Sequence, residues 1–234
     1  MLHGDTIDFV GYSTVQPSIC ESGALRLLVS RYLNIGYTLT KGLPYPFDDP
    51  NNRLITGDEV DQAIRNACNF SHRRRTLHFW RAPFAFSVRL SQPLTGVIEW
   101  TLFVQSDTLL GLDNNLGEQN AAEFMNVVIV ALETLPTYYG CLYTSQNPPS
   151  VEDVIRGVVS KVYPANYFGD SFLGLVEREK LSGMPAWLNE TVGSGRLVVP
   201  SIKALYADDD LALQEANRYL FGRVEPSIAD EQND

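Results

Sequence analysis

Hydrophobic and polar residues alternate in some segments of the chain and recur with a spacing of three to four residues in others. Alternation is typical of strands that bury one face, and the wider spacing is typical of amphipathic helices. The first pattern predicts strands at residues 5–13, 76–81, 85–91, 96–104, 137–144 and 197–202. The second pattern predicts helices at residues 22–33, 56–68, 118–135, 150–162, 170–181 and 211–220.

The order of these elements predicts an α+β fold, with a mainly antiparallel sheet packed with helices. Three of the strands follow one another within residues 76–104 with only short turn sequences between them, which favours an antiparallel meander. Trp100 lies on the fully apolar face of the last of these strands, so we expect it to pack on the core beneath helix 118–135. We expect a single domain over residues 1–224 and a disordered acidic tail at residues 225–234.

Three local details also follow from the pattern. The helical spacing places Leu33 on the buried face of the first helix, together with three other aliphatic residues. Thr56 and Glu59 have the Thr-x-x-Glu spacing of a capping box, which predicts that they begin the second helix. Gly140 interrupts a predicted strand, where a glycine often marks a bulge.

A proline-rich loop at residues 42–50 is the first candidate binding surface. Its three prolines exclude both a helix and a central strand. Tyr45 and Phe47 are large side chains outside any periodic segment, and Asp48 and Asp49 adjoin them. An aromatic anchor with a charged rim is typical of protein interfaces, so we expect these four residues to bind a partner. In the alternative interpretation, both aromatic side chains fold back over the edge of the core.

The acidic charge is concentrated in the second half of the chain. The sequence contains 28 acidic and 18 basic residues, a net charge of −10, and residues 118–234 account for −9 of it. Such a field repels nucleic acid and attracts a basic macromolecule. Asp208, Asp209 and Asp210 are therefore further candidates for partner binding. Alternatively, these three begin a solvated helix, and the overall acidity only keeps the protein soluble.

The motifs for catalysis and metal binding are incomplete. The histidines are at positions 3, 72 and 78, so the GDS element at residues 169–171 lacks the downstream histidine that an esterase of this type needs. Cys68 and His72 have a spacing compatible with zinc, but a fourth ligand is missing nearby. We therefore expect no enzyme activity, no catalytic residues, no metal and no cofactor.

The longest aliphatic run and the first residues of the sequence predict the cellular compartment. The longest aliphatic run, at residues 127–132, is far shorter than the ~20 residues that cross a bilayer. Residues 1–8 do not have the basic and apolar regions of a secretory signal. We expect a cytoplasmic protein without membrane contact, in which Cys20, Cys68 and Cys141 are buried, reduced thiols.

Three segments give the chain a family resemblance. They are FVGYST at residues 9–14, GYTLTKGLPYPFDDP at residues 36–50 and GVIEWTLFV at residues 96–104, which contains the dipeptide Glu99-Trp100. With the acidic second half, they make the chain similar to the Immunity protein 52 family of bacterial type VI secretion and polymorphic toxin systems. The resemblance implies an α+β inhibitor that binds and neutralises a cognate, basic nuclease toxin with a restriction-endonuclease fold. It implies no catalytic residues, because immunity proteins are binders.

Two other classes of function are compatible with the sequence. A small-molecule hydrolase or transferase that uses carboxylates would need a convergent carboxylate pair in a pocket. A scaffold or regulatory module would bind a partner without neutralising a lethal activity.

Overall fold

The computed structural model describes residues 6–14, 18–42, 53–70, 76–105, 114–143, 148–174, 178–206 and 210–222. The strands are β1 (Thr6–Ser13), β2 (Thr38–Thr40), β3 (Thr76–Arg81), β4 (Phe84–Leu94), β5 (Val97–Gln105), β6 (Tyr139–Tyr143), β7 (Ala165–Phe168), β8 (Leu188–Val192) and β9 (Gly195–Val199). The helices are α1 (Ala24–Asn34), α2 (Asp58–Ala67), α4 (Asn114–Thr134), α5 (Val151–Ile155), α6 (Asp170–Leu173), α7 (Arg178–Ser182) and α8 (Asp210–Phe221), with a 3-10 turn, η2 (Lys203–Leu205).

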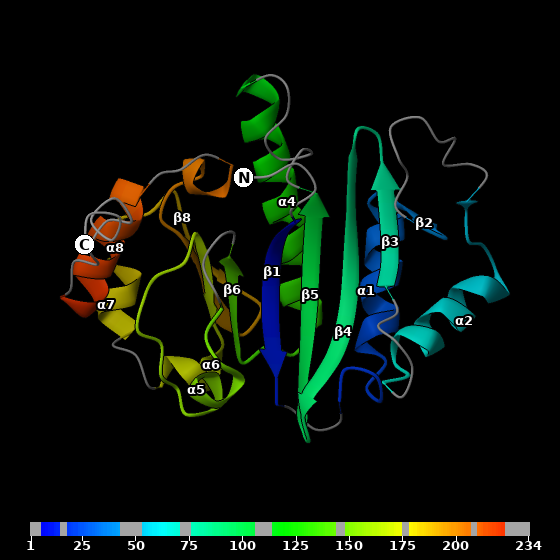
Figure 1. The fold of residues 1–234 in the computed structure, drawn as a ribbon, viewed down its shortest axis with the longest axis horizontal. Coiled ribbons are helices and arrows are strands. Elements are labelled where there is room, and N and C mark those ends of the chain that lie inside the picture. The colour runs from blue at the N-terminus through cyan, green and yellow to red at the C-terminus, as the bar shows by residue number, and fades with distance from the viewer. Residues whose placement is uncertain are drawn as a thin grey trace, which may run out of the picture.

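The strands form one antiparallel sheet in the order β2-β3-β4-β5-β1-β6-β7-β9-β8 (Figure 1). β1 lies in the middle, paired with β5 on one side and β6 on the other. The predicted meander is present as β3, β4 and β5, paired in sequence order. The predicted α+β class with a mainly antiparallel sheet in a single domain is therefore confirmed. The expected tail at residues 225–234 lies outside the described residues.

The larger core lies between one face of the sheet and the helices α1 and α4. On this face β1 contributes Ile7 and Phe9, and α4 contributes Phe124 and Val128, all fully buried. The Tyr32 hydroxyl of α1 donates a hydrogen bond to the carbonyl of Val127 in α4, 2.8 Å away. This bond joins the two helices and satisfies the only polar atom of a buried side chain.

A second core lies on the opposite face, over the β6, β7, β9 and β8 half of the sheet. Here Val10 and Tyr12 of β1 meet side chains from α5, α6, α7 and α8. Successive residues of a strand point to opposite faces, which is why β1 supplies both cores. This half of the molecule therefore has three layers, with α4 on one side of the sheet and α5, α6, α7 and α8 on the other (Figure 1).

Trp100 belongs to the larger core, as its strand pattern predicts. It is 0% exposed, its ring stacks on Phe9 with the centroids 5.6 Å apart, and its Nε1 donates a hydrogen bond to Thr137 Oγ1. Gly11 of β1 lies directly opposite Trp100 in the sheet, and a Cβ at Gly11 would lie 2.2 Å from the Trp100 ring. The indole therefore fills the space that a side chain at position 11 would need.

Three of the predicted local details are wrong. Leu33 is 38% exposed, and Tyr32 takes the buried position beside Leu28 and Val29 in α1. The N-cap of α2 is Gly57, with φ at 54°, and no side chain caps this end, so the capping box does not form. Gly140 is not at a bulge: it pairs in regular register with Gly11, and its missing side chain leaves room for the ring of Phe9.

The helix predicted at residues 150–162 is only α5, because a turn ends it early. Gly157 has a φ of 70°, a left-handed conformation that glycine adopts without strain. The N–H of Val158 then donates to the carbonyl of Asp153 at 2.8 Å, a pattern that closes the last turn of a helix.

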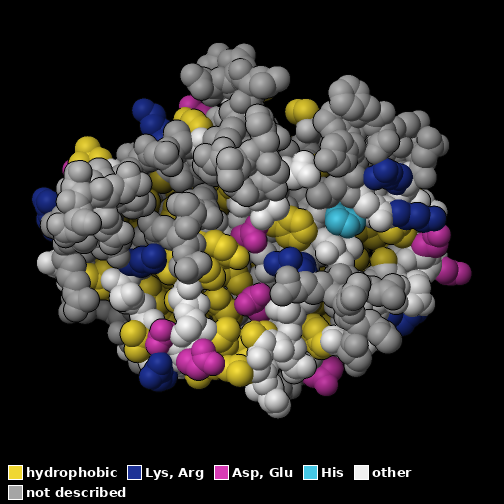
Figure 2. Space-filling model, viewed as in Figure 1, with side chains coloured by type: hydrophobic (Ala, Val, Ile, Leu, Met, Phe, Trp, Pro, Cys, Tyr) yellow, Lys and Arg dark blue, Asp and Glu magenta, His cyan; other side chains and the backbone are white. Residues whose placement is uncertain are grey.

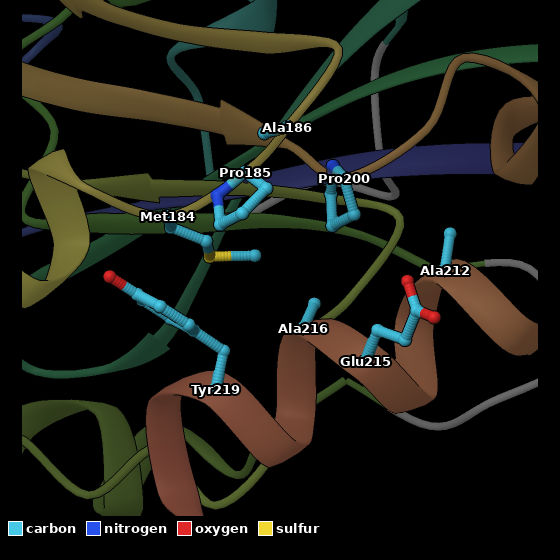
Figure 3. A pocket seen from close by; sticks show the side chains of 8 residues that line it. All are labelled: Met184, Pro185, Ala186, Pro200, Ala212, Glu215, Ala216 and Tyr219. Carbon is cyan, nitrogen blue, oxygen red and sulfur yellow. The ribbon is translucent and has the colours of Figure 1, made fainter.

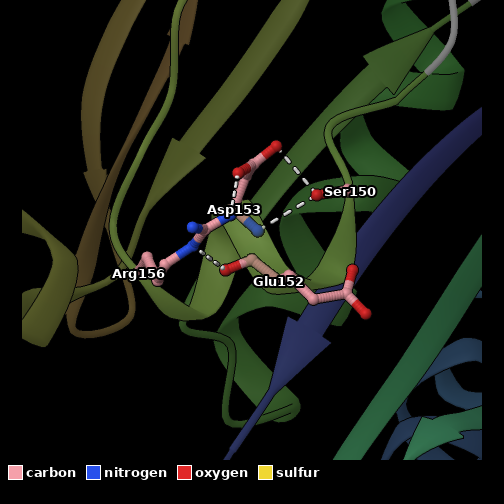
Figure 4. Close-up of polar contacts among 4 residues, drawn as sticks. All are labelled: Ser150, Glu152, Asp153 and Arg156. Atoms are coloured by element: carbon pink, nitrogen blue, oxygen red, sulfur yellow. Dashed lines mark hydrogen bonds and ion pairs between the residues drawn. The ribbon is translucent and has the colours of Figure 1, made fainter.

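The other end of α5 is capped by Ser150 (Figure 4). The Ser150 hydroxyl accepts a hydrogen bond from the backbone N–H of Asp153 at 3.1 Å and donates one to its carboxylate at 2.8 Å. Nη2 of Arg156 then donates to the same carboxylate at 2.7 Å. The cap satisfies one of the unpaired N–H groups at the start of the helix.

Replacing Ser150 with alanine should lower the free energy of unfolding by about 1 kcal/mol, the usual value of a serine N-cap. Urea denaturation measures this change. Ser171→Ala is a matched control, because Ser171 is an exposed serine in α6 whose N-cap is Gly169, and it should change stability by less than about 0.5 kcal/mol. Equal effects in the two variants would contradict the capping role.

The cysteines differ from the expectation of three reduced thiols. Cys20 and Cys68 form a disulfide, with an S–S distance of 2.22 Å and 5.7 Å between their Cα atoms. Cys141 is free and buried, as expected, and burial raises the pKa of its thiol. The 48-residue separation gave no signal of pairing in the sequence; the fold brings the turn before α1 against the end of α2. In this disulfide Cys68 is not a zinc ligand, and His72 lies outside the described residues.

Within the described residues no helix has the length and apolar character needed to cross a bilayer. The same residues contain no group of three histidine, cysteine or carboxylate side chains arranged to hold a metal ion.

Candidate functional site

Most of the predicted partner-binding residues lie outside the described residues. These are Tyr45, Phe47, Asp48, Asp49, Asp208 and Asp209. Asp210 is described as the first residue of α8, at the position where its alternative interpretation as a helix start would place it. The contacts of the predicted loop are therefore not described, and the surface around α8, the helix that begins at Asp210, is the part of the predicted interface that the structure describes.

A pocket of about 380 Å³ lies beside α8 (Figure 3). One wall is a face of α8 formed by Ala212, Glu215, Ala216 and Tyr219. Met184, Pro185, Ala186 and Pro200 lie opposite, in the segments next to β8 and β9. Figure 3 shows Glu215 and Tyr219 on either side of Ala216, with the two proline rings facing the helix across the opening. These positions come from three separate parts of the sequence, so no local pattern could have predicted the pocket.

Hydrogen bonds hold the walls of the pocket in place. The N–H of Trp187 donates to the carbonyl of Pro200 at 3.1 Å, which joins the two proline-containing segments. The Asn189 amide donates to the carbonyls of Leu181 and Met184 at 3.1 and 3.0 Å. Nζ of Lys180 donates to the carbonyl of Leu220 at the end of α8. We expect a pocket with walls tied in this way to keep its shape when empty.

Large apolar side chains are exposed at a residue that lines the pocket and at sequence neighbours of lining residues. Trp187, which follows Ala186, is 46% exposed, Leu211 at the start of α8 is 67% exposed, and Tyr219 in the pocket wall is 38% exposed. Single exposed apolar residues are ordinary, but tryptophan and tyrosine around a concave surface are the residue types that most often anchor a protein partner. We call this surface, with the pocket, the α8 surface.

Glu215 gives the α8 surface a negative charge. It is exposed, and within the described part of the chain its carboxylate makes no hydrogen bond or ion pair. Arg218 lies three residues further along α8, yet it forms no ion pair with Glu215. The pocket thus combines apolar walls with one carboxylate that is free to bind a cation.

A second polar surface lies on β3, β4, β1 and β6, on the face of the sheet that also carries the second core, and Figure 2 shows acidic, basic and hydrophobic side chains on it. Asp8 and Tyr143 are paired across β1 and β6, and the Tyr143 hydroxyl donates to Asp8 Oδ2 at 3.3 Å. Burial and the Asp8 carboxylate raise the pKa of Tyr143. Asp8 Oδ1 is buried and has no hydrogen-bond partner among the described residues.

His78 and Ser87 lie on the same surface, with Nδ1 and Oγ 2.8 Å apart. A histidine beside a serine is the beginning of a nucleophile-base pair. Ser87 is completely buried, however, so a substrate does not reach its hydroxyl in this conformation. Burial also lowers the pKa of His78. The contact is therefore better explained as a buried polar pair that satisfies its own hydrogen bond.

Comparisons with known proteins show distant similarity to solved structures. No protein-family model matches the chain, and no curated protein matches it. Among solved structures, the chain is similar to the Pseudomonas aeruginosa T6SS protein PA0821, with 10% sequence identity and a TM-score of 0.45 over 92% of this chain and 75% of that chain. A similarity this distant does not place the chain in a family, so membership of the Immunity protein 52 family stays a prediction.

Proposed function

We propose that this chain is a non-enzymatic immunity protein that binds and neutralises a basic toxin. The leading candidate for this toxin is a nuclease. The observation that carries the proposal is the α8 surface, where Tyr219 lines a pocket with a free carboxylate and the exposed Trp187 and Leu211 directly adjoin lining residues in the sequence. Partner proteins bind through buried aromatic anchors inside a polar rim, and the α8 surface has both parts.

The net charge of −10 supports a basic partner. A nuclease must present a positive cleft to nucleic acid, and an acidic protein that occupies or flanks the cleft uses the same electrostatic attraction. Tyr45, Phe47, Asp48 and Asp49, with Asp208, Asp209 and Asp210, remain proposed contacts of this partner. Through repulsion, the same charge disfavours direct binding of nucleic acid to this chain.

The disulfide favours a variant of this function. Disulfides persist in oxidising compartments and are rare in the cytoplasm, where a nuclease toxin acts and where we expected the chain to work. Cys20–Cys68 therefore favours a second candidate, an immunity protein that neutralises a basic toxin in an oxidising compartment. Lysing producing cells directly in acid and then labelling the denatured chain with a maleimide separates the two: three labelled cysteines support the cytoplasmic nuclease inhibitor, and one supports the second candidate.

The neutralisation test is co-expression. The chain should restore the growth of cells that express the toxin encoded by the neighbouring gene, and the purified pair should form a complex. Growth inhibition that persists despite a stable complex would contradict neutralisation and favour a scaffold role. Turnover of nucleic acid or esters that disappears in a single carboxylate variant of the purified chain would contradict the proposed absence of catalysis.

Charge should control how fast the complex forms. Raising the salt concentration from about 50 to 500 mM shortens the Debye length severalfold, so association should slow by about tenfold or more. Asp48→Asn with Asp49→Asn should also slow association, whereas Tyr45→Ala or Phe47→Ala should speed dissociation, because rim charges steer encounter and aromatic anchors hold the complex. Stopped-flow kinetics measures both rates. Salt-independent association with unchanged dissociation would exclude the loop and the acidic field from the interface.

A further inference from the structure

We propose that the pocket beside α8 holds an arginine side chain of the partner protein, with its guanidinium group at the Glu215 carboxylate. The inference rests on the proposed function, because it names the chemical group that the partner inserts. No other residue of the partner is assigned.

The size and the walls of the pocket fit one long side chain. Its volume of about 380 Å³ is near the lower end of the ~300–1,000 Å³ typical of ligand pockets, so it suits a single side chain better than a folded segment. Ala216, Met184 and the two prolines supply apolar contacts for a methylene stem. Arginine buries its stem along apolar surface while its charged end meets a polar group.

The charge of the pocket favours a cation. Glu215 is the only charged residue among those that line the pocket, and its carboxylate is unpaired within the described part of the chain. Burying an acidic side chain of the partner there would add repulsion, and an apolar one would leave the carboxylate desolvated without a partner. A basic side chain neutralises Glu215 and fills the pocket at the same time.

The geometry favours arginine over lysine. Glu215 and Tyr219 are four residues apart, one helical turn, so they lie on the same face of α8 with the small Ala216 beside them (Figure 3). A guanidinium group binds a carboxylate through two parallel hydrogen bonds and also stacks on an aromatic ring. A lysine ammonium group is not planar and cannot form the two parallel hydrogen bonds. It would therefore bind Glu215 less well and would not stack on Tyr219.

The test uses small analogues and the protein alone. The ¹⁵N-labelled chain is titrated with N-acetyl-arginine methylamide to millimolar concentrations, and backbone amide shifts of α8 are followed. We expect saturable shifts at Glu215, Ala216 and Tyr219, and at least tenfold weaker binding in Glu215→Gln, because a hydrogen bond to a charged group is lost. The lysine analogue should bind at least threefold more weakly, and the norleucine analogue should give no saturable shifts there.

Glu190→Gln is the matched control. Glu190 is an exposed carboxylate on β8, next to Asn189, whose side chain reaches α7, so Glu190 points to the opposite face of the sheet. It should leave arginine binding unchanged. Equal loss in the two variants would show a general charge effect, and binding by Glu215→Gln within threefold of wild type would overturn the proposal. Equal binding of the lysine analogue would overturn the assignment to arginine.

The same experiment separates this inference from the proposed function. Saturable arginine binding in a chain that neutralises no toxin would support the pocket and contradict the immunity role. Toxin neutralisation by a chain that shows no arginine-dependent shifts would support the immunity role and contradict the pocket.

Discussion

Replacing Trp100 with alanine should lower the free energy of unfolding by about 3–5 kcal/mol, the usual cost of removing a large aromatic side chain from a core. The indole is completely buried, stacks on Phe9 and donates a hydrogen bond to the Thr137 hydroxyl, so its removal leaves a cavity and takes away that hydrogen bond. Urea denaturation at constant pH measures the change. Far-ultraviolet circular dichroism shows whether the variant folds at all.

Trp187→Ala is the matched control for this prediction. Trp187 is 46% exposed, so its removal should change stability by less than about 0.5 kcal/mol. Gly11→Ala should destabilise the protein for the complementary reason, because the new methyl group would occupy the space of the Trp100 ring. A Trp100→Ala variant with an unchanged denaturation midpoint and lost partner binding would instead make Trp100 an interface residue.

Breaking the Cys20–Cys68 disulfide should lower the free energy of unfolding by about 4 kcal/mol. The bond joins residues 48 positions apart, and in the chain-entropy model a loop of this length restricts the unfolded chain by about that amount. The oxidised protein is compared with the Cys20→Ala, Cys68→Ala double variant by denaturation without reductant. Addition of dithiothreitol to the wild type should reproduce the loss.

Cys141→Ala provides the control for the disulfide. Denatured, oxidised wild type should react with one equivalent of a thiol reagent, and the Cys141→Ala variant with none, because Cys141 is the free cysteine. The free energy of unfolding of the Cys141→Ala variant should still fall when the Cys20–Cys68 disulfide is reduced. Three reactive thiols in the air-oxidised wild type, or equal stability with and without dithiothreitol, would contradict the predicted bond and its contribution.

The long elements were predictable from sequence, whereas the short strands β2 and β7 were not. The 21-residue α4 and the central β1 repeat their pattern often enough to identify the period. β2 and β7 have three and four residues, too few to show a period, and they become strands because neighbouring strands supply their hydrogen bonds. In α1 the more apolar Leu33 was expected inside. Tyr32 takes that place because α4 offers a carbonyl to its hydroxyl.

The candidate site was less predictable for a physical reason. The net charge is the ground for expecting a basic partner, but a net charge does not say which residues make the contact. Of the residues named from sequence, Asp210 is described as the first residue of α8, the helix that forms one wall of the pocket. Pro200 and Met184 have no local signal, because their position depends on the β8–β9 hairpin and the turn after α7.

The central place of β1 has a consequence for how the chain folds during synthesis. β1 leaves the ribosome before its neighbours in the sheet, β5 and β6, and the last of these ends at Tyr143. At bacterial and eukaryotic translation speeds the wait for β6 is on the order of ten seconds. Contacts this far apart in sequence also slow folding itself. The apolar first strand is thus a segment that chaperones have time to bind, and its unpaired edges make the nascent chain more prone to aggregation than the finished protein.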